Sequence, residues 1–285
     1  MNTTVKWTAA DVRRCWPVPG AAADKYSRGV LGIVAGSDAY PGAAVLVANA
    51  AVRCGAGFVR YVGPRRAQDL VLSRLPEVVV HTPADASDHL PRAQAWVVGP
   101  GVADHPEQDA AIGAVTESGL PMVVDAGALE SIVRARAAGD RNAASDRVLL
   151  TPHADELVRC LQSLRHDVSR ADVDNDRAGH ARLLSETARA TVLLKGSLTL
   201  VVSPGGGTVE LPPASPWLAT AGSGDTLAGI AGALLAGGLS AVEAGASAAW
   251  VHARAGDLAS GGGPISALDI ADRLPAVIAA TLAAN

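Results

Sequence analysis

The chain has 285 residues, 49% of them hydrophobic and 3% aromatic, with a formal net charge of −4 at pH 7. Its length and apolar content allow it to bury a sizeable core. Its acidic balance argues against a nucleic-acid binder, which would carry a basic patch. Its three cysteines, Cys15, Cys54 and Cys160, are far apart and include no CxxC pair, so they indicate reduced thiols rather than a disulfide framework or a zinc ribbon. The N-terminus has no apolar run of the signal-peptide type, and the apolar stretch 227–239 is too short to span a bilayer, which predicts a cytoplasmic protein without a membrane segment.

After a lead-in over residues 1–29, short β-branched runs alternate with longer Ala-rich stretches. The expected strands cover residues 30–35, 58–62, 78–80, 95–98, 122–125, 148–150, 192–195 and 198–202. The expected helices, which show helical spacing of apolar residues, cover residues 42–54, 65–75, 106–118, 223–236, 241–259 and 267–280. Apolar strands alternating with helices are typical of parallel strands buried on both faces. The sequence therefore predicts a single α/β domain over residues 1–285, with a mostly parallel central sheet.

Unusual polar or Gly-rich turns follow the ends of several expected elements. They lie at residues 36–37, 99–101, 125, 151–153, 195–196 and 221–225. In open α/β sheets, ligands bind beyond the carboxyl ends of the strands. We therefore expect these turns to converge along one rim of the sheet and to form an active site there.

The turn at residues 221–225 (AGSGD) directly precedes an apolar helix. Gly222 and Gly224 have no side chains, so a phosphate could closely approach the unpaired N–H groups and the positive dipole end of that helix. We expect Gly222, Ser223 and Gly224 to form an anion hole for a phosphoryl group in transfer. Asp225 is compatible with two roles, an N-terminal cap worth about 1 kcal/mol or a general base for a substrate hydroxyl. The turn is not a P-loop, because no Lys follows the second Gly.

The AGSGD turn resembles the anion-hole motif of ribokinase-like enzymes, in which the Asp is the catalytic base. Further segments resemble one branch of that group in the same order: GSDAYPGAA at 36–44, RCGAG at 53–57, VGPG at 98–101, VDA at 124–126, LTPH at 150–153 and LKGSLT at 194–199. Over residues 26–259, approximately, the chain is thereby identified as a member of the ADP-dependent NAD(P)H-hydrate dehydratase family. The resemblance implies the ribokinase-like three-layer α/β/α architecture.

The resemblance also implies an activity, the repair of damaged nicotinamide nucleotides. Family members dehydrate the S-epimer of hydrated NADH and NADPH, with ADP as co-substrate and AMP and phosphate as products. Mg²⁺ is expected as a cofactor because it neutralises nucleotide phosphates, although no residue is an evident metal ligand. The resemblance further implies a homo-oligomer, with a tetramer favoured. Because only about thirty residues precede the first expected strand, we expect no fused epimerase domain and a separate NAD(P)H-hydrate epimerase as functional partner.

Carried onto this chain residue by residue, the resemblance implies two sets of binding residues. The substrate-binding set is Gly42, Ala43, Gly101, His153 and Asp225. The nucleotide-binding set is Lys195, Gly196, Ser197, Leu198, Thr199 and Gly224. Asp225 is the expected catalytic residue, taking the proton of the substrate hydroxyl as that hydroxyl attacks the terminal phosphate of ADP. Each position has a structural alternative: His153 as a helix cap, the small residues as packing or turn positions, and the segment 195–199 as an ordinary hairpin.

Two positions depart from the family pattern, and two other functions stay open. Asp155 stands where the family usually has Gly, which puts a charge near the expected nicotinamide region and leaves the role of Glu156 open. Gly127 stands where many members have Asp. The AGSGD turn also fits a kinase for a small alcohol such as a vitamin precursor, or a non-catalytic nucleotide-binding protein. The segments GSDAYPGA at 36–43 and TPH at 151–153 favour the dehydratase over the kinase.

Overall fold

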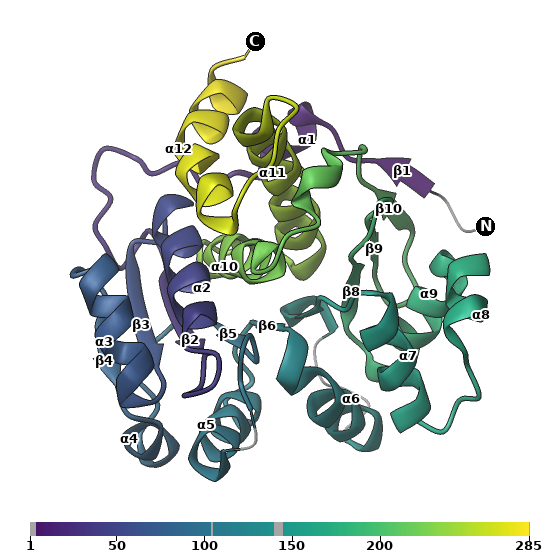
Figure 1. Cartoon of the computed structure of the whole chain (residues 1–285), viewed down its shortest axis with the longest axis horizontal. Helices are drawn as coiled ribbons and strands as arrows, with labels where there is room; N and C mark the ends of the chain where they lie inside the picture. Colours follow the sequence, from purple (N-terminus) through teal and green to yellow (C-terminus); the bar gives the residue numbers. More distant parts are fainter. Residues whose placement is uncertain (1–3, 104, 140–144, 285) are drawn as a thin grey trace.

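The computed structural model describes residues 4–103, 105–139 and 145–284. Over these residues one sheet of ten strands runs across the molecule in the order β1-β10-β9-β8-β7-β6-β5-β2-β3-β4 (Figure 1). The strands are β1 (Thr4–Lys6), β2 (Val30–Val34), β3 (Phe58–Val62), β4 (Val79–His81), β5 (Ala95–Val98), β6 (Met122–Val124), β7 (Val148–Leu150), β8 (Thr191–Leu194), β9 (Leu200–Val202) and β10 (Thr208–Glu210). Every pairing is parallel except those of β9 with β8 and with β10.

Helices cover both faces of the sheet, which gives the expected three layers (Figure 1). One face shares its apolar core with α1 (Ala9–Cys15), α2 (Gly42–Arg53), α3 (Arg65–Arg74), α10 (Ser223–Ala236), α11 (Ala241–Ser260) and α12 (Ala267–Ala283). The other face shares its core with α4 (Pro83–Asp88), α5 (Pro106–Glu117), α6 (Leu129–Ala138), α7 (Ala154–Ser163), α8 (Arg170–Asn175) and α9 (Arg177–Ala188). The predicted three-layer α/β/α fold is thus confirmed.

The strands separate the two cores because successive side chains of a strand point to opposite faces. In β5, Val97 belongs to the core under α10, whereas Trp96 and Val98 belong to the core on the opposite face. Small residues let the helices pack closely on the first face: a Cβ placed on Gly229 of α10 would lie only 2.9 Å from the Cβ of Ala50 in α2. Glycine at this position therefore permits the contact of α2 with α10.

Most predicted elements are confirmed within one to three residues, but the prediction lacks the elements of two longer regions and, outside them, helix α4 and strand β10. The expected lead-in contains a strand, β1, and a helix, α1, which begins at a capping box of Thr8 and Asp11; residues 1–3 of the lead-in lie outside the described residues. Between residues 126 and 190 the chain forms α6, α7, α8 and α9, for which no helix was predicted. The expected strand 198–202 begins later, at Leu200.

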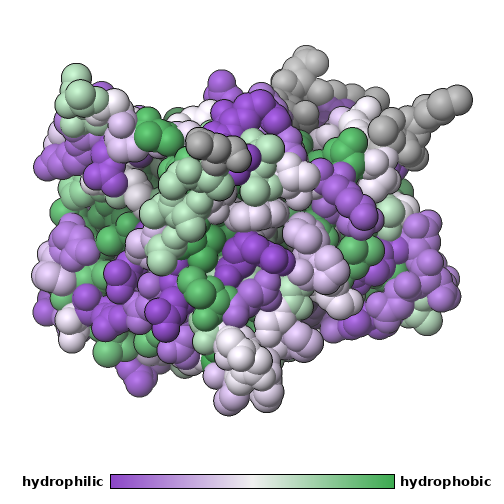
Figure 2. Space-filling view, turned by 90° about the horizontal axis from the view of Figure 1, so that it is seen from above, coloured by the Kyte–Doolittle hydropathy of each residue, from purple (hydrophilic) through white to green (hydrophobic). Residues whose placement is uncertain are grey.

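Over the described residues, no helix combines the length and the apolarity that crossing a bilayer requires. The face shown in Figure 2 has hydrophobic residues in several separate areas among hydrophilic ones. Large exposed apolar side chains belong to different elements, such as Leu70 in α3, Leu258 in α11 and Leu268 in α12. The exposed apolar surface is therefore distributed over the molecule.

Candidate active site

The turns that follow the parallel strands meet at one edge of the sheet. Strands β2, β5, β6, β7 and β8 pair in parallel as neighbours, so their carboxyl ends share that edge. The Gly36 N–H donates to the carbonyl oxygen of Pro100 at 2.7 Å, and the Lys195 N–H donates to that of Pro152 at 2.9 Å. The structure thus confirms the convergence of these turns along one rim.

Helix α10 begins at the Gly-rich turn with backbone N–H groups left free. Gly222 adopts the left-handed conformation, with φ 83°, and caps the helix without a side-chain hydrogen bond. The Ser223 N–H donates to the Thr220 carbonyl oxygen at 3.2 Å. Within the described chain, the N–H groups of Gly224 and Asp225 have no hydrogen-bond acceptor. Free N–H groups at a helix N-terminus form a ready site for an anion.

An ammonium group lies directly beside this turn. The Nζ of Lys195 is 3.5 Å from the position that a Cβ would occupy on Gly224. It forms an ion pair with Asp125 Oδ1 at 2.7 Å and lies 3.6 Å from Glu156 Oε2. Burial acts to lower the pKa of Lys195, but the two carboxylates outweigh burial and the pKa is raised. The side chain therefore stays positively charged next to the free N–H groups.

Asp125, which follows β6, orients this cation. Its side chain is 3% exposed, and besides the ion pair it accepts a hydrogen bond from Thr151 Oγ1 at 2.9 Å. Thr151 follows the neighbouring strand β7. The sequence placed both residues on the rim without assigning them a role, because their contact with Lys195 depends on the order of the strands.

The Asp225 carboxylate has the properties of a base rather than of a cap. Among the described residues it forms no ion pair, and helix α10 has no side-chain cap of the kind that Asp11 provides in α1. Burial, chiefly, raises the pKa of Asp225 to about 6; the negative charge of Asp125 acts in the same direction, and Lys195 opposes it. The Asp225 carboxyl group is thus partly buried and unpaired, and with this pKa it can accept a proton near neutral pH.

His153 lies at the start of α7 and caps it. Its Nδ1 accepts hydrogen bonds from the N–H groups of Asp155 at 3.2 Å and Glu156 at 3.4 Å. Glu156 Oε2 in turn accepts the His153 N–H at 2.7 Å, and the same carboxylate approaches Lys195. The imidazole is 47% exposed, so capping leaves part of the ring available to a ligand at the rim.

The two departures from the family pattern both have a local explanation. Asp155 accepts a hydrogen bond from Arg170 Nη1 at 2.7 Å, and this hydrogen bond, first among the causes, lowers the pKa of Asp155. The added charge is therefore paired at the surface, and Glu156 keeps its place between His153 and Lys195. At Gly127, a Cβ would lie 2.7 Å from the Val102 carbonyl oxygen, so the residue allows close approach of the loop after β5.

The segment 195–199 is the turn between β8 and β9, and Arg177 of α9 donates hydrogen bonds to its backbone. Arg177 Nη2 donates to the carbonyl oxygens of Lys195 at 3.0 Å and Leu198 at 3.3 Å. Gly196, Ser197 and Leu198 are exposed, so the outer side of this turn is open to a ligand. Arg177 received no role from the sequence, because it lies before β8 in a region where no helix was expected.

The small residues at the start of α2 lie together with the loop after β5. A Cβ on Gly101, where φ is 64°, would lie 2.5 Å from the Ala43 Cβ and 3.4 Å from the Gly36 Cα. A Cβ on Gly42 would meet no atom within 4 Å, so this position faces open space. Gln108, which the sequence did not single out, is buried and donates from Nε2 to the Gly36 carbonyl oxygen at 2.7 Å.

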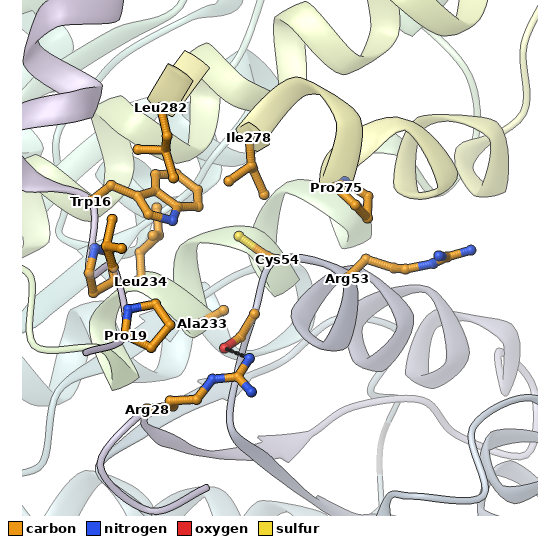
Figure 3. Close-up of a pocket in the computed structure, with 13 residues that line it drawn as sticks. Trp16, Pro19, Arg28, Arg53, Cys54, Ala233, Leu234, Pro275, Ile278 and Leu282 are labelled. Carbon is orange, nitrogen blue, oxygen red and sulfur yellow. Dashed lines mark hydrogen bonds between the residues drawn. The ribbon is translucent and has the colours of Figure 1, made fainter. Parts of the chain in front are cut away.

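A separate cavity of about 210 Å³ lies at the opposite end of α10. Trp16 and Pro19 of the N-terminal segment, Leu234 of α10 and Ile278 of α12 are among the residues that line it (Figure 3). Leu234 is nine residues beyond Asp225, about 13 Å along the helix axis. This cavity therefore does not belong to the rim that carries Lys195 and Asp225.

Comparison with known proteins shows which family the chain resembles. Residues 31–275 match the family model described as NAD(P)H-hydrate dehydratase. The bifunctional NAD(P)H-hydrate repair enzyme Nnr of Mycobacterium leprae is 44% identical over 278 residues, which are 97% of this chain and 55% of the relative. The ADP-dependent (S)-NAD(P)H-hydrate dehydratase of Neisseria meningitidis serogroup B is 37% identical over 241 residues, 81% of this chain and 77% of the relative. The chain spans about half the length of the bifunctional relatives it matches.

A solved structure extends the similarity to the whole fold. The ADP/ATP-dependent NAD(P)H-hydrate dehydratase of Bacillus subtilis, co-crystallized with ATP/Mg²⁺, superimposes with a TM-score of 0.86 at 27% identity. The match covers 97% of this chain and 98% of that chain. The fold described above is therefore that of a known dehydratase.

Proposed function

Because the chain belongs to the NAD(P)H-hydrate dehydratase family, we propose that it dehydrates the S-epimer of hydrated NADH and NADPH, with ADP as co-substrate and AMP and phosphate as products. The observation that carries the proposal is the arrangement at the start of α10. There the first turn of the helix carries the free N–H groups of Gly224 and Asp225 and the Asp225 carboxylate, whose pKa is raised. The Lys195 ammonium lies beside this turn. This is what transfer of a phosphoryl group to an alcohol requires.

Asp225 acts as the general base in the first step. The C6 hydroxyl of the hydrate loses its proton to the Asp225 carboxylate as its oxygen attacks the terminal phosphorus of ADP, and the bond from that phosphorus to the bridging oxygen breaks to release AMP. With a pKa of about 6, the carboxylate is mostly ionised at pH 7 and is a stronger base than an ordinary aspartate.

The backbone at the start of α10 stabilises the transferring group. The N–H groups of Gly224 and Asp225 donate to its equatorial oxygens, and Lys195 supplies a positive charge on the nucleotide side. We place the expected anion hole on the turn Gly222, Ser223 and Gly224, with the free N–H groups of Gly224 and Asp225 as donors. The nucleotide lies along the exposed turn of residues 195–199 and reaches Gly224.

The second step removes the oxygen from the ring as phosphate. The lone pair of the ring nitrogen expels phosphate from C6, and loss of a proton from C5 restores the dihydropyridine. Phosphorylation makes this elimination feasible because hydroxide is a poor leaving group and phosphate a better one. Gly42 leaves open space at the start of α2 for the dinucleotide, Gly101 lets the loop after β5 pack closely on Ala43, and the exposed part of His153 is placed to contact the nicotinamide half.

Mg²⁺ fits the site only as a partner of the nucleotide. In the described part of the chain, no group of three or more His, Cys, Asp or Glu side chains is arranged to hold a metal ion. The buried carboxylates at the rim, Asp125 and Glu156, are engaged by Lys195. When bound, Mg²⁺ would neutralise phosphate charge and be held by phosphate oxygens and water. Homo-oligomer formation and supply of the S-epimer by a separate epimerase stay predictions.

The decisive experiment is incubation of the protein with hydrated NADH, ADP and Mg²⁺. We expect the absorbance of NADH to return in step with the release of one phosphate per NADH, and no reaction when AMP replaces ADP. A stable phosphorylated alcohol in a substrate screen would indicate a kinase instead. Nucleotide binding without phosphate release from any substrate would indicate a non-catalytic protein, and either result would overturn the proposal.

A further inference from the structure

A buried histidine of a neighbouring helix contacts the turn that begins α10. His252 lies on α11, which packs against α10, and it is 8% exposed. Its Nε2 lies 3.1 Å from Ser223 Oγ and 3.1 Å from the Ser223 carbonyl oxygen. A single ring nitrogen therefore meets both oxygen atoms of the residue between the two glycines of the turn.

Ser223 has its polar groups directed into the protein rather than toward a ligand. The residue is 8% exposed, its N–H donates to the Thr220 carbonyl oxygen, and its hydroxyl and carbonyl oxygens face His252. The N–H groups of the next two residues, Gly224 and Asp225, are the free ones. Contacts with Thr220 and His252 thus hold Ser223 in place, and the two free N–H groups directly follow it in the chain.

The imidazole is suited to this contact because it stays neutral. Burial, chiefly, lowers the pKa of His252 to about 4, with Lys195 acting in the same direction and the Ser223 backbone contact opposing. A neutral ring either donates from Nε2 to the carbonyl oxygen or accepts the hydroxyl proton of Ser223 there. In both tautomers the ring ties Ser223 to α11 and adds no charge to the site.

We propose that His252 is a positioning residue for phosphoryl transfer, acting through Ser223 without touching substrate. Its hydrogen bonding to Ser223 holds the start of α10 in the geometry in which the N–H groups of Gly224 and Asp225 meet the transferring phosphoryl group. If these donors are displaced, their interaction with the transition state weakens more than the binding of the substrate does. The inference rests on the proposed function for its catalytic readout and on the geometry of the turn alone for its structural readout.

The experiment compares His252→Leu, which removes the hydrogen bond, with His252→Gln, which keeps a polar group, and with the matched control Ser247→Ala. Ser247 lies on the same helix, is fully buried and contacts Trp7 and Cys15 away from the rim. We expect His252→Leu to lower kcat at least about tenfold, less than the loss of an oxyanion donor itself, with KM for hydrated NADH within about twofold. His252→Gln should recover most of kcat, and Ser247→Ala should match the native protein.

The structural readout is hydrogen–deuterium exchange of the peptide covering residues 219–227. We expect faster exchange there in His252→Leu and no change in Ser247→Ala. Equal kcat in His252→Leu and Ser247→Ala would overturn the inference while leaving the proposed function intact. If the native protein itself shows no dehydration, the proposed function fails, and unchanged exchange in His252→Leu then overturns the inference separately. If His252→Leu does not fold, His252→Gln decides: faster exchange over 219–227 with native kcat would overturn it.

Discussion

Replacing Asp225 by Asn should abolish turnover and at the same time stabilise the folded chain. The pKa of Asp225 is raised from 3.8 to about 6, chiefly by burial. Below pH 3.8 the group is protonated in both the folded and the unfolded chain, so its ionisation does not lower the free energy of unfolding. As the pH rises toward 6, the unfolded chain loses the proton first, and the cost of ionising the buried carboxyl grows until it is complete above pH 6. At about 1.36 kcal/mol per pKa unit, this cost is at most about 3 kcal/mol.

The assay is urea unfolding of the native protein and of Asp225→Asn at several pH values between 4.5 and 8. The free energy of unfolding of the variant should rise relative to the native protein as the pH increases, by up to about 3 kcal/mol. Asp269→Asn is the matched control with the opposite sign, because hydrogen bonds from Ser266 lower the pKa of Asp269 and its loss should destabilise the chain at neutral pH. A pH-independent difference for Asp225→Asn would refute the reasoning about burial, and near-native turnover would refute the assignment as base.

Three further predictions concern the charges around this carboxylate. Lys195→Met should raise KM for ADP at least about tenfold, because the nucleotide phosphates lose their cation; an unchanged KM in steady-state assays would contradict its place in the nucleotide site. Asp125→Asn should move the acid limb of the kcat/KM profile, expected near pH 6 from Asp225, to lower pH, because a negative charge that raises the Asp225 pKa is gone; an unmoved limb in an active variant would show that the two carboxylates do not interact. Asp155→Gly, which restores the residue usual in the family, should leave kcat and KM for hydrated NADH within about twofold, since the Asp155 charge is paired with Arg170 at the surface; a larger change would place Asp155 in the substrate site.

The sequence was sufficient to locate the Gly-rich turn that begins α10, and the reason is local. The helix from Ser223 to Ala236 was predicted with its observed bounds, because the Gly-Ser-Gly-Asp turn and the apolar run after it are contiguous. The rim was also predictable, since each turn directly follows its own strand. Local patterns suffice where the determinants of an element lie within that element.

The partners of Lys195 could not be predicted in the same way. Asp125 is 70 residues away in sequence, and its contact depends on β6, β7 and β8 being neighbours in the sheet, which no local pattern specifies. Helix α7 was not predicted, although a capping role was one of the two readings of His153, because a histidine cap is less diagnostic of a helix start than the usual Ser, Thr, Asp or Asn caps. His252 gave no signal either, because a single histidine in an Ala-rich helix does not reveal that the helix crosses the start of another.

The origin of the Lys195 ion pairs has a consequence for newly made or damaged copies of the chain. The three charged groups lie just after β6, in α7 and just after β8, so the cation is in place only when that stretch of parallel sheet is complete. A nascent, proteolysed or partly denatured copy lacks the charge arrangement that the proposed nucleotide site requires. Under the proposed function, incomplete copies would therefore not consume ADP, and only chains able to complete the reaction would use the nucleotide.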